Sequence, residues 1–270
     1  MTDVQKWLRT WSVPGAGEEA RSAVLLCFPP TGLGASTFRP WQEYLGSRAL
    51  VAGVQLPARE ERIEEEPPGT VEEVAEAAVE ALDALASAQE LPLTLVGVGS
   101  GAAPALESAA LLRTRGRAVR RLVVATARPP HFVGSPGDET IDQATNILGQ
   151  TDDEIVASGC SCLPGLEVAA ELDSWLVERM LVSFRATVKM IADYRWTHQP
   201  LNCPVEAWHG ADDTLVRTEH NEGWRRYAAA GFSARAFPDC HDYFTVSRNA
   251  MPPALDALLD ADETATTHVD

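Results

Sequence analysis

Short apolar segments of strand length recur along the chain, and this recurrence constrains the fold more than any other feature of the sequence. The segments cover residues 23–28, 49–56, 93–98, 122–127, 205–208 and 234–237. Each is almost continuously apolar, which is typical of strands covered on both faces of a parallel sheet. Helical stretches separate them; residues 71–88, for example, place alanine and leucine at helical spacing. We therefore expect an α/β protein with a mostly parallel, doubly wound sheet.

A long segment without any strand signal interrupts this alternation between about residues 129 and 200. It contains helical patches such as 171–194, so its simplest interpretation is a helical lid inserted between two strands. Such a lid would lie over the C-terminal edge of the sheet, where α/β active sites are found. We expect its core to contain Trp175, Phe184 and Tyr194. The whole chain is then one domain over residues 1–260, closed by a helix at 251–259 and followed by a polar, frayed tail at 261–270.

Composition excludes several classes of partner. The formal charge of −17 makes nucleic acid an improbable ligand, because phosphate binding needs clustered lysine and arginine. No apolar run approaches the ~20 residues that span a bilayer, so no membrane contact is expected. The five cysteines are an odd, scattered set and residues 1–15 lack the pattern of a signal peptide, which indicates reduced thiols in the cytoplasm. No second Cys/His pair follows Cys160 and Cys162 at ligand spacing, so neither a metal nor another cofactor is expected.

The third apolar segment ends in a glycine-rich turn that opens a helix, the layout of a G-x-S-x-G nucleophile elbow. In that motif the residues two before and two after the tip must be small, so that strand and helix pack closely. If Gly99 is the tip, Gly97 and Gly101 occupy those two positions. If Ser100 is the tip, Val98 occupies one of them and crowds the turn. The spacing therefore favours a tip residue without a side chain, although an ordinary glycine-rich turn at a helix start has a similar pattern.

Two later residues complete the order of an α/β-hydrolase active site. Asp213 follows the strand at 205–208, three residues after Gly210, which is the usual place of the triad carboxylate in this fold. His241 lies in the loop after the strand at 234–237. The order elbow, acid, histidine is that of α/β-hydrolases. We therefore predict an α/β-hydrolase fold in which Asp213 and His241 are the catalytic pair.

The sequence resembles the type II thioesterases that serve polyketide and nonribosomal peptide assembly lines, over about residues 7–244. Residues 27–36 resemble the family segment C-F-P-H-A-G-G-S-A-S, and residues 55–62 resemble V-Q-Y-P-G-R-E-D-R. Further matches follow the elbow, in the lid, and at the strand that begins near residue 203. The resemblance implies a cytoplasmic protein of antibiotic biosynthesis whose partner is a polyketide or peptide intermediate, free or bound to a carrier protein.

The departures from the family pattern fall at the active centre. Where the family has G-H-S-M-G, this chain has Gly99 in place of the nucleophile and Val98 in place of the preceding histidine. Pro30 replaces the histidine of F-P-H-A-G-G. Asp213 and His241, by contrast, stand where the acid and base of the family belong.

The same resemblance implies an oxyanion hole made by the backbone N–H groups of Thr31 and Ser100. Pro30, Ser36 and Val98 are the side chains expected near a substrate. Together these positions outline the expected site around a tip that carries no side chain.

Three functions are compatible with this pattern. The first is a repurposed enzyme in which His241 and Asp213 perform acid/base chemistry, such as elimination, cyclisation or isomerisation. The second is a hydrolytic editing thioesterase that uses Ser100, or water activated by His241. The third is a non-catalytic protein that binds a carrier protein. A chain without a side chain at position 99 forms no acyl-enzyme there, so the first function is our leading prediction.

Overall fold

The fold was analysed in a computed structural model, which describes residues 6–12, 21–85, 88, 90–133, 146–157, 166–238 and 250–267. Three residues singled out in the sequence, Cys160, Cys162 and His241, lie outside this set. Most of the predicted sheet and of the lid falls within it.

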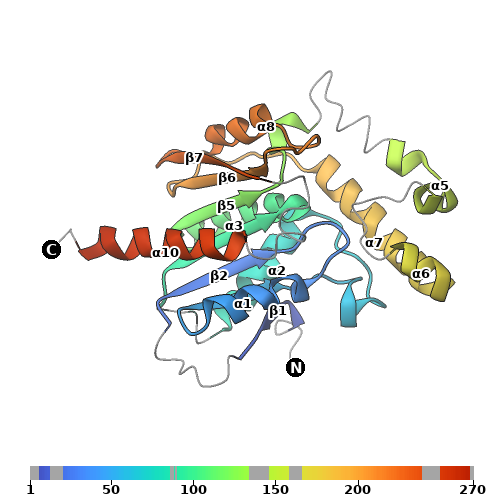
Figure 1. The fold of residues 1–270 in the computed structure, drawn as a ribbon, viewed down its shortest axis with the longest axis horizontal. Helices are drawn as coiled ribbons and strands as arrows, with labels where there is room; N and C mark the ends of the chain where they lie inside the picture. Colours follow the sequence, from blue (N-terminus) through green and yellow to red (C-terminus); the bar gives the residue numbers. More distant parts are fainter. Residues whose placement is uncertain are drawn as a thin grey trace.

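The described residues form a seven-stranded sheet in the order β1-β3-β2-β4-β5-β6-β7 (Figure 1). The strands are β1 (Leu8–Thr10), β2 (Ala23–Phe28), β3 (Ala49–Val54), β4 (Leu93–Val98), β5 (Arg121–Ala125), β6 (Val205–Gly210) and β7 (Phe232–Phe237). β1 pairs with β3 antiparallel, and every other pair is parallel. The predicted α/β architecture with a mostly parallel sheet is thus confirmed.

Helices cover both faces of the sheet. They are α1 (Arg39–Leu45), α2 (Val71–Asp83), α3 (Ala102–Thr114), α5 (Asp152–Ala157), α6 (Leu166–Leu172), α7 (Ser174–Asp193), α8 (Thr218–Gly223) and α10 (Met251–Thr267). Apolar side chains of α2 and α3 pack on one face, and those of α1 and α10 pack on the other. This two-sided burial explains why β2, β3 and β4 read as continuous apolar runs rather than as alternating ones.

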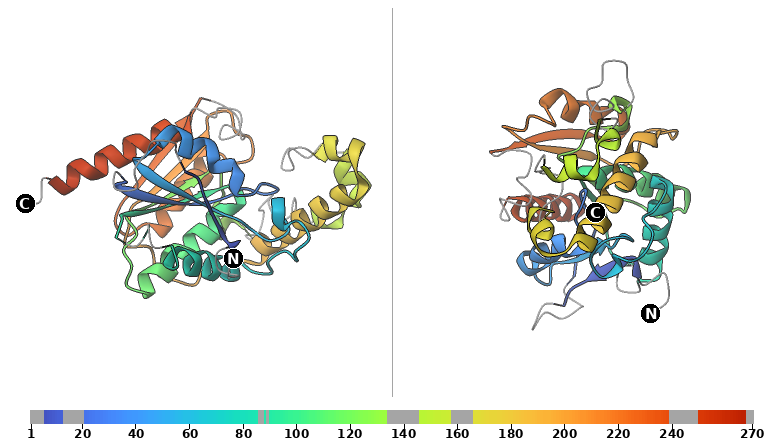
Figure 2. Two further views of the ribbon diagram at one scale, coloured as in Figure 1. Left: turned by 90° about the horizontal axis from the view of Figure 1, so that it is seen from below. Right: turned by 90° about the vertical axis from the view of Figure 1, so that its right-hand side faces the viewer.

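The segment between β5 and β6 contains α5, α6 and α7, which project from one end of the sheet, away from the C-terminus of α10 (Figures 1 and 2). A small separate core holds these helices together, with Ile155, Leu166, Leu181 and Phe184 fully buried. The expectation for Trp175 was wrong, since this side chain is 46% exposed. It precedes Phe184 by nine positions, which places it about 180° around the same helix.

Other differences concern element ends and one side chain. Tyr194 is buried in the main core rather than in the lid core. Helix α10 continues to Thr267 instead of ending at 259, so most of the expected frayed tail is helical. Neither glycine nor proline occurs after position 259, and nothing there interrupts the helix. Among the helices of the described ranges, none combines the length and apolarity needed to cross a membrane.

Candidate active site

The turn after β4 has the packing of a nucleophile elbow. A Cβ atom on Gly97 would lie 2.5 Å from the Cα of Ala102, and one on Gly101 would lie 2.3 Å from the carbonyl oxygen of Phe28. Both neighbours are backbone atoms, so neither position accepts a side chain. This is the requirement for small residues that an elbow tip at position 99 imposes.

Gly99 itself adopts a left-handed conformation, with φ of +53°. Around it there is more room than around the flanking glycines, because a Cβ there would meet Pro30 first, with its Cβ at 3.2 Å. Gly99 and Pro30 therefore lie close together in the fold, although they are far apart in sequence. Val98, just before the tip, is fully buried in the core with Val123 and Trp208.

The acidic residue is buried at the same edge of the sheet. Asp213 follows β6, and its Oδ1 accepts hydrogen bonds from the N–H groups of Leu215 and Val216, both at 2.8 Å. Its neighbour Asp212 is exposed to solvent. These two N–H donors fix the direction of the carboxylate of Asp213, which distinguishes this buried residue from the exposed Asp212.

Strand register brings the elbow and the acid loop together. Val98 pairs with Ala125 of β5, which in turn pairs with Trp208 of β6. The elbow and the loop after β6 are thus separated by a single strand, a spacing of about 10 Å. β7 ends at Phe237, paired with Gly210, so the chain leaves toward residue 241 from this same edge. The geometry of His241 lies outside the described residues.

The loop after β2, residues 29–36, lies beside the elbow and carries the predicted oxyanion donor of Thr31. Within the described part of the chain, the N–H of Thr31 has no hydrogen-bond partner. Ser100 occupies the short 3-10 turn at Gly99–Gly101 that opens α3, where helix N–H groups lack intrahelical acceptors. Ser36 is exposed, and its hydroxyl donates to the carboxylate of Glu60 rather than standing free for a substrate.

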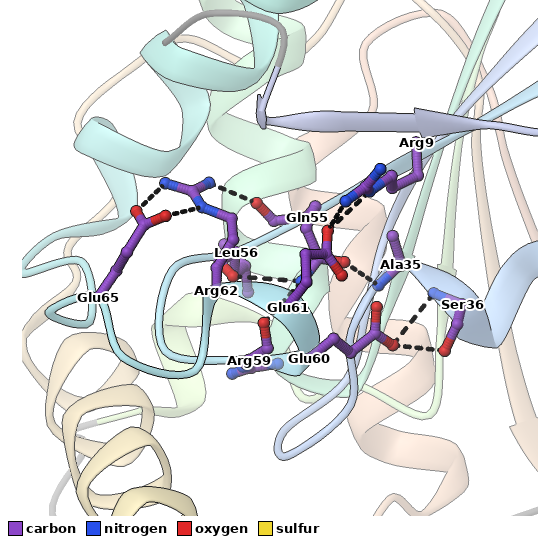
Figure 3. A network of polar contacts seen from close by, with 10 residues as sticks. All are labelled: Arg9, Ala35, Ser36, Gln55, Leu56, Arg59, Glu60, Glu61, Arg62 and Glu65. Carbon is purple, nitrogen blue, oxygen red and sulfur yellow. Dashed lines mark hydrogen bonds and ion pairs between the residues drawn. The ribbon is translucent and has the colours of Figure 1, made fainter. Parts of the chain in front are cut away.

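A network of polar side chains that the sequence reasoning missed holds this loop in place (Figure 3). Gln55 accepts a hydrogen bond from the N–H of Ala35 at 3.0 Å. Arg59 is buried and donates to the carbonyl oxygens of Pro30, at 2.8 Å, and Leu33, at 2.5 Å. The sequence does contain a signal for this network, since residues 55–62 resemble the thioesterase segment V-Q-Y-P-G-R-E-D-R.

A small hollow adjoins the elbow on the lid side, with room for about one water molecule. Ser100 and Arg59 line it, together with Thr187 and Met190 of α7. The lid thus comes directly against the turn that carries Gly99. In the described residues no group of histidine, cysteine and acidic side chains is arranged to hold a metal ion.

Comparison with known proteins gives one consistent result. The thioesterase domain family matches residues 23–253. The gramicidin S biosynthesis protein GrsT of Aneurinibacillus migulanus is 25% identical over 93% of each chain, and a probable cadicidin biosynthesis thioesterase of Streptomyces griseus is 27% identical over 96% of this chain and 68% of its own. The solved structure of RedJ, a thioesterase from the prodiginine pathway in Streptomyces coelicolor, is 32% identical, has a TM-score of 0.73 and covers 92% of this chain and 95% of its own. This chain therefore belongs to the thioesterase family and has the α/β-hydrolase fold.

Proposed function

We propose that this thioesterase-family protein of secondary metabolism works without an elbow nucleophile, and that Asp213 and His241 supply acid/base chemistry to a polyketide or peptide intermediate. The observation that carries the proposal is the contrast at the elbow. Backbone packing at Gly97 and Gly101 has the tightness that a nucleophile elbow needs, yet the residue at the tip, Gly99, has no side chain.

The size of each effect indicates which chemistry is available. A Ser-His-Asp enzyme without its serine keeps about 10³–10⁴-fold catalysis over water, from binding and the oxyanion hole. A positioned general base contributes about 10²–10⁴-fold, and an oxyanion donor another 10²–10³-fold or so. Together, the rate contributions of the base and the oxyanion donors are enough for proton transfer next to a carbonyl group. Cleavage of an acyl bond would require more without a nucleophile.

The residues take the following roles in such a reaction. His241 removes a proton from the carbon beside the carbonyl, and Asp213 stabilises the imidazolium that forms. The N–H groups of Thr31 and Ser100 bind the resulting enolate oxygen. His241 then returns the proton to a different atom in an isomerisation, or to a departing hydroxyl in an elimination, so that the enzyme ends each cycle unchanged.

The relatives suggest the class of substrate. GrsT is named for gramicidin S biosynthesis and RedJ for the prodiginine pathway, so both act in the biosynthesis of secondary metabolites. By analogy, we propose that the substrate here is a carbonyl-containing intermediate of such a pathway, free or bound as a thioester to a carrier protein.

Hydrolysis is the second candidate, and the position of Ser100 is the observation in its favour. Ser100 lines the hollow beneath the lid, next to Gly101. After a small shift of the turn, its hydroxyl could attack an acyl group bound beside the elbow. Hydrolysis by water that His241 activates directly belongs to the same candidate.

A serine-directed fluorophosphonate distinguishes the two candidates. We expect no covalent label on the wild-type protein, as measured by intact mass. The matched control is the double variant Gly99→Ser/Pro30→His, which restores the family residues at these two positions and should be labelled at position 99. Stoichiometric labelling of the wild type at Ser100, abolished by Ser100→Ala, would overturn the leading proposal in favour of hydrolysis.

Substitution of the acid and base tests whether the protein is catalytic at all. His241→Ala and Asp213→Asn should each lower formation of the pathway product by about 10²–10⁴-fold, the usual contribution of a general base. Circular dichroism of both variants checks that the fold is retained. Unaltered product formation by a folded His241→Ala variant would instead indicate a non-catalytic, carrier-protein-binding role.

A further inference from the structure

The loop after β2, residues 29–36, is called the oxyanion loop below, after the predicted donor Thr31. The loop between β3 and α2, residues 55–65, lies between the oxyanion loop and the lid, and is called the strap. Its central residue, Arg59, is buried and binds both neighbours at once. One guanidinium nitrogen, Nη1, donates to the carbonyls of Pro30 and Leu33 in the oxyanion loop. The other, Nη2, donates to the hydroxyl of Thr187 in α7 at 2.8 Å.

All three acceptors of Arg59 are uncharged. No carboxylate among the described residues pairs with the guanidinium, since Glu60 is engaged with Ser36. Burial lowers the pKa of Arg59 to about 10, an effect that the charge of the neighbouring Glu60 opposes, so the side chain is still a cation at neutral pH. A buried cation that is hydrogen-bonded only to uncharged groups is costly, and an apolar residue would fill the space more cheaply if packing were its whole purpose.

The backbone of the strap is bent to present Arg59 inward. Ala58 and Glu60, on either side of it, have φ of +61° and +51°, a region that residues with a side chain rarely adopt. Hydrogen bonds hold this conformation: the N–H of Ala58 donates to the carbonyl of Arg62 at 2.9 Å, and the side chain of Gln55 donates to the carbonyl of Arg59 at 3.0 Å. The inward direction of Arg59 is thus imposed by its surroundings.

The lid helix binds the strap at a second place. Arg179 of α7 donates to the carbonyl oxygens of Ile63 and Glu65, both at 3.0 Å. Unlike Arg59, this side chain has no hydrogen bond to the oxyanion loop. Among the described residues, α7 is therefore hydrogen-bonded to the strap through Arg179 and through Thr187, and of these two contacts only the one at Thr187 continues through a single side chain to the residues beside Gly99.

We propose that Arg59 is a positioning residue that couples the lid helix α7 to the oxyanion loop. While α7 lies on the strap, Thr187 holds the guanidinium where it fixes the carbonyls on either side of Thr31, and the N–H of Thr31 keeps its direction. When α7 moves away, Arg59 loses one of its three acceptors and the loop loosens. This coupling goes beyond the proposed function and is independent of it, because an acid/base reaction and a hydrolysis would use the same N–H group.

Hydrogen–deuterium exchange tests the coupling without any substrate. Thr187→Val removes the acceptor while keeping the shape, and Thr187→Ser is the matched control that keeps the hydroxyl. We expect amides of residues 29–36 to exchange on the order of tenfold faster in the valine variant, as loss of a hydrogen bond to a charged group implies. The serine variant should exchange like the wild type, and a peptide from α1 should be unchanged in both.

Two results would overturn the proposal. One is faster exchange in the valine variant that is confined to α7, with residues 29–36 unaffected. The other is equal acceleration in the valine and serine variants, which would indicate general loosening of the helix. Arg59→Lys is a second, independent measurement, because a lysine lacks the fork that reaches both loop and lid; it too should accelerate exchange at 29–36. Because no turnover is measured, failure here leaves the labelling test of the proposed function unaffected.

Discussion

Replacement of the elbow glycines by alanine should reduce the free energy of unfolding slightly at Gly99 and strongly at Gly97 and Gly101. At Gly99 the added methyl would be 3.2 Å from the Cβ of Pro30 and 3.7 Å from its Cα. A shift of a few tenths of an ångström relieves that contact, so the left-handed backbone supplies most of the cost, about 1–2 kcal/mol. With about 2–4 °C lost per kcal/mol in a chain of this size, we expect the melting temperature to fall by roughly 2–8 °C.

The flanking glycines should be far less tolerant. At Gly101 the methyl would be 2.3 Å from the carbonyl oxygen of Phe28 and 2.7 Å from that of Pro29. At Gly97 it would be 2.5 Å from the Cα of Ala102. These contacts are with backbone atoms of the sheet and helix, and only separation of the two elements relieves them. We expect a loss above about 4 kcal/mol, or no folded protein.

Urea unfolding followed by tryptophan fluorescence measures all three variants on one scale. Wild-type-like slopes would show that the change is one of stability rather than of the unfolded state. Equal losses at Gly99 and Gly101 would refute the reasoning, because the tip would then be as tightly enclosed as its flanks. A mild effect at Gly101 would refute it equally, since the elbow would then be an ordinary turn.

Three further predictions concern titratable groups whose pKa is shifted by full or partial burial. Burial raises the pKa of the Cys27 thiol, so this residue should resist iodoacetamide at pH 8 in the folded protein and react only after denaturation, as followed by peptide mass spectrometry. Burial and the adjacent Glu107 raise the pKa of Tyr194, so its contribution to stability is complete below the pKa of an unfolded tyrosine, near 10, and is lost as the pH rises beyond that value. Tyr194→Phe should therefore lower the free energy of unfolding by about 1–3 kcal/mol at pH 7, measured by urea unfolding, and should remove this contribution to the loss of stability at alkaline pH. Burial, together with Arg226, lowers the pKa of His131, so the fold should lose stability as the pH falls below about 6.5, and His131→Gln should reduce that acid sensitivity; an unchanged pH profile of the variant would contradict the assignment.

The strands and the elbow register followed from the sequence because their physical causes are local. A strand covered on both faces tends to be apolar along its whole length, as β2 is. The register at Gly99 followed from the need for two small neighbours at fixed spacing. The packing distances at Gly97 and Gly101 now give that need its atomic basis.

The features that escaped sequence reasoning depend on contacts between distant segments. β1 has three residues, too few for an alternating pattern, and its place is set by pairing with β3. Trp175 has the character of a core residue but lies on the outer face of its helix. Arg59 is a charged residue in a loop, and only the folded chain brings Pro30 and Thr187 within its reach.

The positions of the residues that differ from the family pattern favour a catalytic protein over a non-catalytic binding protein. Two of the three positions that differ from the family pattern, Gly99 and Pro30, lie close together, and the third, Val98, directly precedes Gly99, so the differences gather at the elbow. Around that point, Asp213 and Arg59 are buried and hydrogen-bonded, at a cost in desolvation that apolar side chains would avoid. The proposed function accounts for this cost, because a site that positions a base and an oxyanion loop requires such groups. We therefore propose that a different reaction, rather than loss of reaction, accompanies the absence of a side chain at position 99.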